Sequence, residues 1–247
     1  MTNYVFIGDV HSQFSKFSAA VDWIVKNVED YHIIQGGDLF DSRSKESNSL
    51  LVYNLVKLLE DRITVLHSNH HIKLYKILTQ ENNNMQNLES LHRTVTDFDF
   101  DNNKGLKDEI VNWLETLPYG VSFKDQSGLE YRACHAYWFK KLYVPNDYEG
   151  LYTIHEVSAK AKGQMLYGIS RKGEDGGNER ILWWSNVNDS YCGEKEEFVR
   201  VSFHYHEVSL DIEGSSGRKH LILDGSCGDE GGELVVYDVS NHRCVRF

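Results

Sequence analysis

Proline, cysteine and long apolar runs are scarce in this chain of 247 residues. Only two prolines occur and no stretch of linker composition separates the halves, so we expect one domain over residues 1–247. No apolar run approaches the roughly 20 residues of a membrane-spanning helix. The opening residues, MTNYVFIGDVHS, also lack the basic region and apolar stretch of a signal peptide. These absences favour a cytoplasmic protein with no membrane partner.

Basic residues are also in deficit. The 26 Lys and Arg residues against 37 Asp and Glu give a formal net charge of −11. Affinity for nucleic-acid backbones comes mostly from Lys and Arg, so we expect no extensive nucleic-acid surface. Bound dications would still allow a local site to take a phosphate group. The four cysteines, Cys134, Cys192, Cys227 and Cys244, form no Cys-x-x-Cys pair, which argues against a zinc knuckle and predicts free thiols.

Alternating apolar strands and helices are present in the first half of the chain. Apolar runs predict strands at Tyr4–Ile7, Tyr31–Ile34 and Ile63–Leu66. Helical spacing predicts helices over Phe14–Val28, around Leu51–Leu59 and from about Ile72 to Leu78. This order is typical of an α/β fold that begins with parallel strands.

The second half is predicted to be rich in strands. A helix is expected over Asp108–Leu117 and a flexible loop over Gly173–Asn178. The expected strands are Tyr119–Phe123, Leu129–Cys134, Phe198–Phe203, His220–Leu223, Glu233–Asp238 and Arg243–Phe247.

Polar side chains follow the predicted strands. Ligands of open α/β sheets bind beyond the carboxyl ends of the strands, so these residues are expected to share one crevice. His204 and His206, two apart on a predicted strand, would point to the same face. A mixture of carboxylate, amide and imidazole groups suits Mn²⁺, Fe or Zn²⁺ better than Ca²⁺ or Mg²⁺. The residues concerned are Asp9, His11, Asp38, Asp41, Asn69, His70, His135, His204 and His206.

Each cluster alone has a simpler interpretation. A single Asp-x-His is more typical of a capped turn, and a single His-x-His of a surface pair. We also interpret six histidines as ordinary, namely His32, His67, His92, His155, His220 and His242. Five separate clusters at predicted strand ends favour a metal site over a merely polar loop.

The ordered motifs resemble those of the calcineurin-like metallophosphoesterases. GDVH at 8–11, GDLFD at 37–41, NH at 69–70, His135 and HYH at 204–206 match the order GDxH, GDxxDR, GNH(E/D), H, GHxH. LILDGSC at 221–227 and GGELVV at 231–236 resemble the tail of one branch. That branch holds symmetrical diadenosine tetraphosphatases, phage-type serine/threonine phosphatases and the phosphatase domain of bacterial polynucleotide kinase-phosphatase. The resemblance implies a β-sandwich flanked by helices in α-β-β-α layers.

The resemblance also implies a site with two divalent transition-metal ions, Mn²⁺ first, with Fe, Zn²⁺ or Ni²⁺ as alternatives. Asp9, His11 and His206 would hold one ion, Asn69, His135 and His204 the other, and Asp38 would bridge them. Two ions about 3.5–4 Å apart can activate a shared water and clamp the phosphoryl oxygens. His70, oriented by Asp41, would protonate the leaving oxygen. Arg43 would grip the phosphate, and Asp224 is a further candidate at the substrate.

The sequence departs from the family pattern at five places. Ser12, Ser68 and Phe203 stand where the pattern has glycine, His71 replaces an acidic residue, and Arg43 comes one place late. The leading hypothesis is hydrolysis of a phosphoprotein, a dinucleoside polyphosphate or a nucleotide or RNA-end phosphate. The alternative is a metal-binding but catalytically weak protein that acts as a binding module. The retained proton donor, His70 with Asp41, favours the enzyme.

Overall fold

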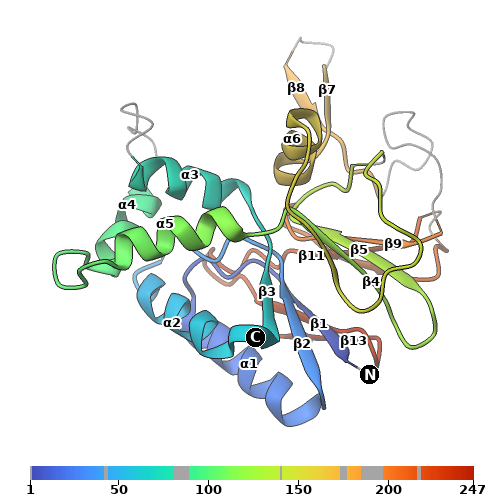
Figure 1. Ribbon diagram of the computed structural model, residues 1–247, viewed down its shortest axis with the longest axis horizontal. Coiled ribbons are helices and arrows are strands. Elements are labelled where there is room, and N and C mark those ends of the chain that lie inside the picture. Colours follow the sequence, from blue (N-terminus) through green and yellow to red (C-terminus); the bar gives the residue numbers. More distant parts are fainter. Residues whose placement is uncertain are drawn as a thin grey trace.

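Two packed β-sheets form the centre of the computed structural model, which describes residues 2–41, 44–79, 89–139, 141–172, 177–184, 197–215 and 218–247 (Figure 1). The first sheet has the order β13-β12-β1-β2-β3 and the second the order β10-β11-β9-β5-β4-β6. A small hairpin of β7 (Ser170–Lys172) and β8 (Asn178–Arg180) stands apart from both.

The strands of the first sheet are β1 (Asn3–Ile7), β2 (Tyr31–Gln35), β3 (Ile63–Val65), β12 (Val235–Asp238) and β13 (Arg243–Arg246). Those of the second are β4 (Gly120–Lys124), β5 (Glu130–Cys134), β6 (Tyr152–Ile154), β9 (Val199–Ser202), β10 (Val208–Asp211) and β11 (His220–Leu223). β1, β2 and β3 run parallel, and so do β5, β9 and β11. Each sheet therefore presents three carboxyl strand ends along one edge.

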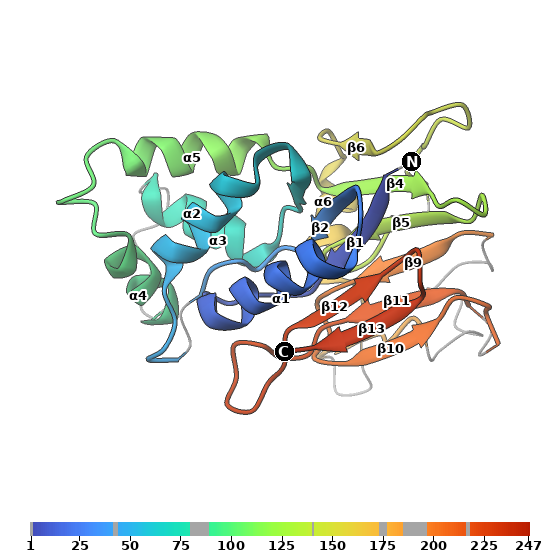
Figure 2. The ribbon, with the colours of Figure 1, turned by 90° about the horizontal axis from the view of Figure 1, so that it is seen from below.

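Helices cover the outer face of the first sheet (Figure 2). Alternation along β1 explains the layers, because Val5 and Ile7 pack against the helices while Tyr4 and Phe6 pack against the second sheet. The helices are α1 (Phe14–Asn27), α2 (Ser49–Leu59), α3 (Asn69–Leu78), α4 (Glu89–Phe98) and α5 (Leu106–Thr116), with a 3-10 turn at Glu60–Arg62. On the second sheet, α6 (Ala159–Tyr167) buries Met165 with Cys134 and Trp138. The predicted α/β fold of layered sheets and helices is confirmed.

The predicted elements are found with small shifts at their ends, and some were missed. α3 begins at Asn69 rather than near Ile72, because the Ser68 side chain accepts the His71 N–H and caps the helix. Asn178 belongs to β8 and not to the predicted loop, of which residues 173–176 lie outside the described residues. The sequence patterns did not indicate α4, α6, β6, β7, β8 or β10.

Two expectations from composition can be compared with the described residues. Cys134, Cys227 and Cys244 carry free thiols, and Cys192 lies outside the described residues. Within the described part of the chain, none of the helices has the length and apolar character needed to cross a membrane.

Candidate active site

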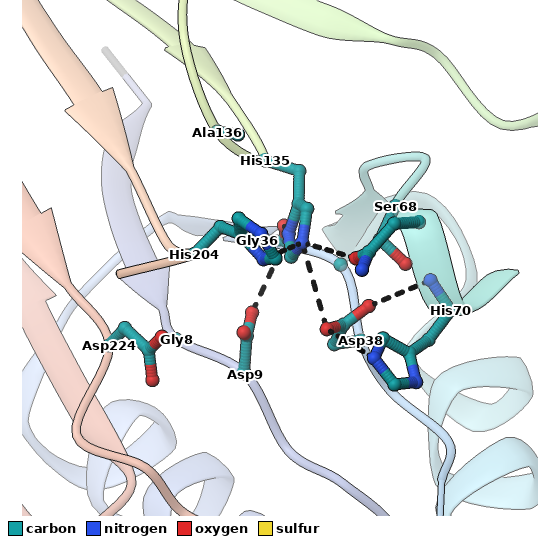
Figure 3. Close-up of polar contacts among 12 residues, drawn as sticks. Gly8, Asp9, Gly36, Asp38, Ser68, His70, His135, Ala136, His204 and Asp224 are labelled. Atoms are coloured by element: carbon teal, nitrogen blue, oxygen red, sulfur yellow. Dashed lines mark hydrogen bonds and ion pairs between the residues drawn. The ribbon is translucent and has the colours of Figure 1, made fainter. Parts of the chain in front are cut away.

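The candidate site residues lie just beyond the carboxyl ends of six strands that run parallel within their sheets. Because both sheets place these ends on the same side of the sandwich, segments far apart in sequence meet there. Figure 3 shows Asp9, Asp38 and His135 pointing toward one another. The strand ends and their residues are β1 with Asp9 and His11, β2 with Asp38 and Asp41, β3 with Asn69 and His70, β5 with His135, β9 with His204 and His206, and β11 with Asp224.

Unusual backbone conformations are concentrated at these strand ends. Ten described non-glycine residues have positive φ, and six of them belong to the site or its neighbours: His11, Ser12, Asp38, Asp41, His206 and Ser226. Such conformations cost energy and persist where surrounding contacts impose them. The contacts are visible here, since the N–H groups of Val10 and His11 both donate to the Asp38 carbonyl, at 3.2 and 2.9 Å. The strained turns after β1 and β2 thus hold each other in place.

Two groups of candidate metal ligands share one carboxylate. Asp9, His11 and Asp38 form the first group, and Asp38, His135 and His204 form the second. Within each group, the ligand atoms lie within 4.8 Å of one another. A carboxylate common to both groups is the arrangement expected for a pair of ions bridged by Asp38.

The hydrogen bonds of His135 show that the second group fits a cation. Its Nδ1 lies 2.9 Å from the Gly36 carbonyl, which can only accept, so Nδ1 carries the proton. Nε2 then presents a lone pair, and it faces Asn69 Oδ1 at 2.9 Å and Asp38 Oδ2 at 3.6 Å. Three acceptors converging in a buried place repel one another unless a cation lies among them. The donor set of this group therefore suits a divalent metal ion.

Burial keeps the imidazoles of this group in the neutral form that binds metals. Desolvation lowers the pKa of His135, against the opposing attraction of Asp38. Desolvation likewise lowers the pKa of His204 to about 2, and His135 nearby adds to the effect. At neutral pH both rings therefore offer a lone pair without first losing a proton.

His70 and Asp41 form a close pair beside these groups. His70 Nδ1 lies 2.8 Å from Asp41 Oδ2, and His70 Nε2 lies 3.9 Å from Asp38 Oδ2. The backbone of Asp41 is held in turn, since its N–H donates to the hydroxyl of Thr94 at 3.2 Å. Thr94 lies on α4, a helix that the sequence patterns did not indicate. The imidazole is thus oriented on one nitrogen and directs the other toward Asp38.

His206 differs from the other candidates in its surroundings. It belongs to neither ligand group, and its Nδ1 lies 3.1 Å from Ser226 Oγ. The prediction that His204 and His206 lie on a strand was wrong, because β9 ends at Ser202 and the chain turns, with φ of 53° at His206. A ring beyond such a turn no longer follows the alternation of a strand.

Asp224 supports that turn by accepting hydrogen bonds from its backbone. Its two oxygens accept the backbone N–H groups of His206, at 2.7 Å, and Ser226, at 3.0 Å. Burial nevertheless raises the pKa of Asp224, since desolvation outweighs these bonds. The carboxylate is thus placed to hold the segment that carries His206, and a contact with substrate stays a prediction.

Four departures from the family pattern have structural roles. The Ser12 hydroxyl bonds that of Ser49 at 2.8 Å, and Ser68 caps α3. Phe203 is fully buried between the sheets, where a side chain on Gly36 would collide with its ring. His71, which replaces the acidic residue of the pattern, accepts the Leu39 N–H on Nε2 at 3.3 Å. The departures therefore support the turns and the core.

Two arginines are candidates for binding the phosphate. Arg43 lies outside the described residues, so its role stays a prediction. Arg180 on β8, which sequence reasoning missed, has Nη2 3.5 Å from His204 Nε2 and its guanidinium 5.8 Å from the centre of the Tyr205 ring. A lone arginine in a short exposed hairpin gives no sequence pattern, so only its place beside His204 identifies it.

Comparisons with known proteins concern the family and the fold of the chain. A model of the calcineurin-like phosphoesterase family matches residues 2–236. No curated protein matches the chain. Among solved structures, a "putative diadenosine tetraphosphatase" is 14% identical with a TM-score of 0.56, covering 99% of this chain and 92% of its own. A hypothetical protein from Pyrococcus horikoshii OT3 is 12% identical with a TM-score of 0.54, and the match covers 100% of this chain and 87% of that protein. A serine/threonine phosphatase from Saccharomyces cerevisiae is 13% identical with a TM-score of 0.47, and the match covers 96% of this chain and 73% of that protein. The family match over almost the whole chain shows that the protein belongs to the calcineurin-like phosphoesterases.

Proposed function

We propose that the protein is a dinuclear metal-dependent phosphoesterase that hydrolyses phosphate ester or anhydride bonds. The observation that carries this proposal is the pair of ligand groups sharing Asp38, with the His70–Asp41 pair at their side. Asp9 and His11, with His206, would hold one ion. Asn69, His135 and His204 would hold the other.

Mixed nitrogen and oxygen ligands favour transition metals over Ca²⁺ and Mg²⁺, and we propose Mn²⁺ as the native ion, with Fe, Zn²⁺ or Ni²⁺ as alternatives. Bound ions would supply an activated water and positive charge for the phosphoryl oxygens. The protein's own contribution is to fix the positions of these groups, because phosphoryl transfer depends mainly on positioning and charge neutralisation.

His70 is proposed as the general acid. Its Nδ1 lies 2.8 Å from Asp41 Oδ2, so the carboxylate would attract the protonated ring, and Nε2–H would pass its proton to the leaving oxygen as the P–O bond breaks. A hydrolysed ester then leaves as an alcohol rather than as an alkoxide. Water from solvent returns the proton to the neutral ring before the next turnover.

Arg180 is proposed to bind the phosphate. Its guanidinium reaches the rim of the second ligand group, where it could offer paired N–H donors to two phosphate oxygens. Arg43, one residue late in the family motif, is a second proposed contact.

The alternative, a metal-binding module with weak catalysis, differs from the enzyme in one prediction. A binding module has no use for a proton donor held at 2.8 Å by a buried carboxylate. Turnover of p-nitrophenyl phosphate with Mn²⁺, compared with Fe²⁺, Zn²⁺ and Ni²⁺, separates the two. Binding of two ions per chain without turnover under any of these metals would favour the module.

A further inference from the structure

A hollow of about 660 Å³ lies next to the candidate site, where the start of α1, residues 44–46 and the loop between β11 and β12 come together. Its volume is within the range of small-molecule and peptide subsites. In Figure 2 the loop between β11 and β12 runs beneath α1. The polar side chains that line the hollow are Gln13, Lys16, Lys45, Glu46, Asp229 and Glu230, and the rest of the lining is serine and glycine.

Hydrogen bonds connect the walls of this hollow with the candidate ligands. Gln13, two residues after His11, donates from Nε2 to Ser44 Oγ at 2.9 Å. On the other side, Ser226 lies two residues before Gly228 of the lining, and its Oγ is 3.1 Å from His206 Nδ1. The ammonium of Lys16 donates to the Gly232 carbonyl and ties the glycine-rich loop between β11 and β12 to α1. A substrate whose phosphate lies at the ligand groups would therefore extend into the hollow.

The chemistry of the lining argues against two of the substrate classes. None of the described residues that line the hollow is aromatic or aliphatic, so a nucleobase would find no surface for stacking. Among the described lining residues, two lysines stand against three carboxylates, a formal sum of −1. A polyphosphate chain would gain no net attraction from such a lining.

We propose that this hollow binds the basic, extended peptide segment next to a phosphorylated side chain. Glu46 and Glu230 are exposed and would attract lysine or arginine side chains of the substrate. Gln13 and the glycine-rich loop offer amide and carbonyl groups for the peptide backbone. The inference rests on the proposed phosphoesterase function and narrows its substrate to phosphoproteins with basic flanking residues.

The test compares kcat/KM for two phosphoserine peptides, one with lysines and one with glutamates around the phosphoserine. p-Nitrophenyl phosphate serves as a substrate too short to reach the hollow when its phosphate lies at the ligand groups. Diadenosine tetraphosphate represents the polyphosphates. Glu46→Lys and Glu230→Lys each reverse one charge of the lining. Glu29→Lys is the matched control, because it makes the same change on an exposed residue beyond the far end of α1, roughly 20 Å away.

We expect the native protein to prefer the basic peptide over the acidic one and over diadenosine tetraphosphate. Each charge reversal in the hollow should reduce the ratio of kcat/KM for the basic peptide to kcat/KM for the acidic peptide about threefold to tenfold. The reason is that it replaces an attraction by a repulsion at a partly exposed site. Glu29→Lys should keep the native ratio, and all three variants should hydrolyse p-nitrophenyl phosphate at the native rate.

Equal kcat/KM for the two peptides, a ratio unchanged by both reversals, or faster hydrolysis of diadenosine tetraphosphate would overturn the inference. Failure of the proposed function is a distinct result, because p-nitrophenyl phosphate would then not be hydrolysed. In that case the Kd values of the two fluorescently labelled peptides, measured for native protein and Glu230→Lys, still decide whether the hollow selects basic peptides.

Discussion

His70→Ala removes the proposed proton donor and leaves the two ligand groups that share Asp38 in place. Loss of a general acid typically slows the reaction about 10²–10⁴-fold, or roughly 3–5 kcal/mol of barrier. The Asp41 carboxylate is buried and its Oδ2 lies 2.8 Å from His70 Nδ1, so a protonated ring would form a charge-assisted bond with it. Such a bond contributes about 1.5–3 kcal/mol, so Asp41→Asn should slow the reaction roughly 10- to 150-fold.

The assay compares an alkyl phosphate with p-nitrophenyl phosphate. An alkoxide needs a proton as it leaves, whereas p-nitrophenolate leaves without one, so both variants should lose more activity on the alkyl ester. Metal content must be measured alongside, because Asp41 Oδ2 also lies 4.0 Å from His11 Nδ1. His92→Ala, on the exposed face of α4, is the control and should match the native protein. Equal slowing on both esters, or loss of a metal ion in His70→Ala, would refute the role of His70 as a general acid.

Four further predictions concern metals, phosphate, pH and thiols. Metal analysis should find two transition-metal ions per native chain. Asp38→Asn should lower both metal occupancy and activity, since Asp38 belongs to both ligand groups. One ion per native chain, together with a fully active Asp38→Asn variant, would contradict this. Arg180→Ala should raise KM for a phosphomonoester about tenfold, and Arg180→Lys should recover only part of the loss, because lysine lacks the paired donors. Burial lowers the pKa of His220, so the unfolded chain takes up that proton at a higher pH than the folded one, and stability falls as pH drops below about 6.5. Chemical denaturation of metal-free protein should show His220→Gln with a shallower decline over this range, while His92→Gln keeps the native slope. Thiol titration of the denatured, unreduced protein should find all four cysteines free, and a protected pair would count against a reducing compartment.

Much of the site could be predicted from local sequence alone. Apolar runs identified the strands, and the polar residues that follow them were candidates because parallel strands carry their carboxyl ends to a common edge. Asp9, Asp38 and His135 were predicted in this way, and the structure brings them together. His204 was predicted on a strand that in fact ends at Ser202, yet its ring still faces His135.

Other features depended on contacts between distant segments, and no local sequence pattern indicated them. Thr94 holds Asp41 across 53 residues, and Arg180 reaches His204 from a hairpin whose strands are exposed throughout. The hollow beside the site lies between α1 and the loop after β11, which are more than 200 residues apart and are joined by the contact of Lys16 with the Gly232 carbonyl. Local sequence determined which residues follow each strand, since the position of a strand end depends on apolar runs and on turn-forming residues. The tertiary structure decided which distant groups stand beside them, because that depends on how the two sheets and their helices pack.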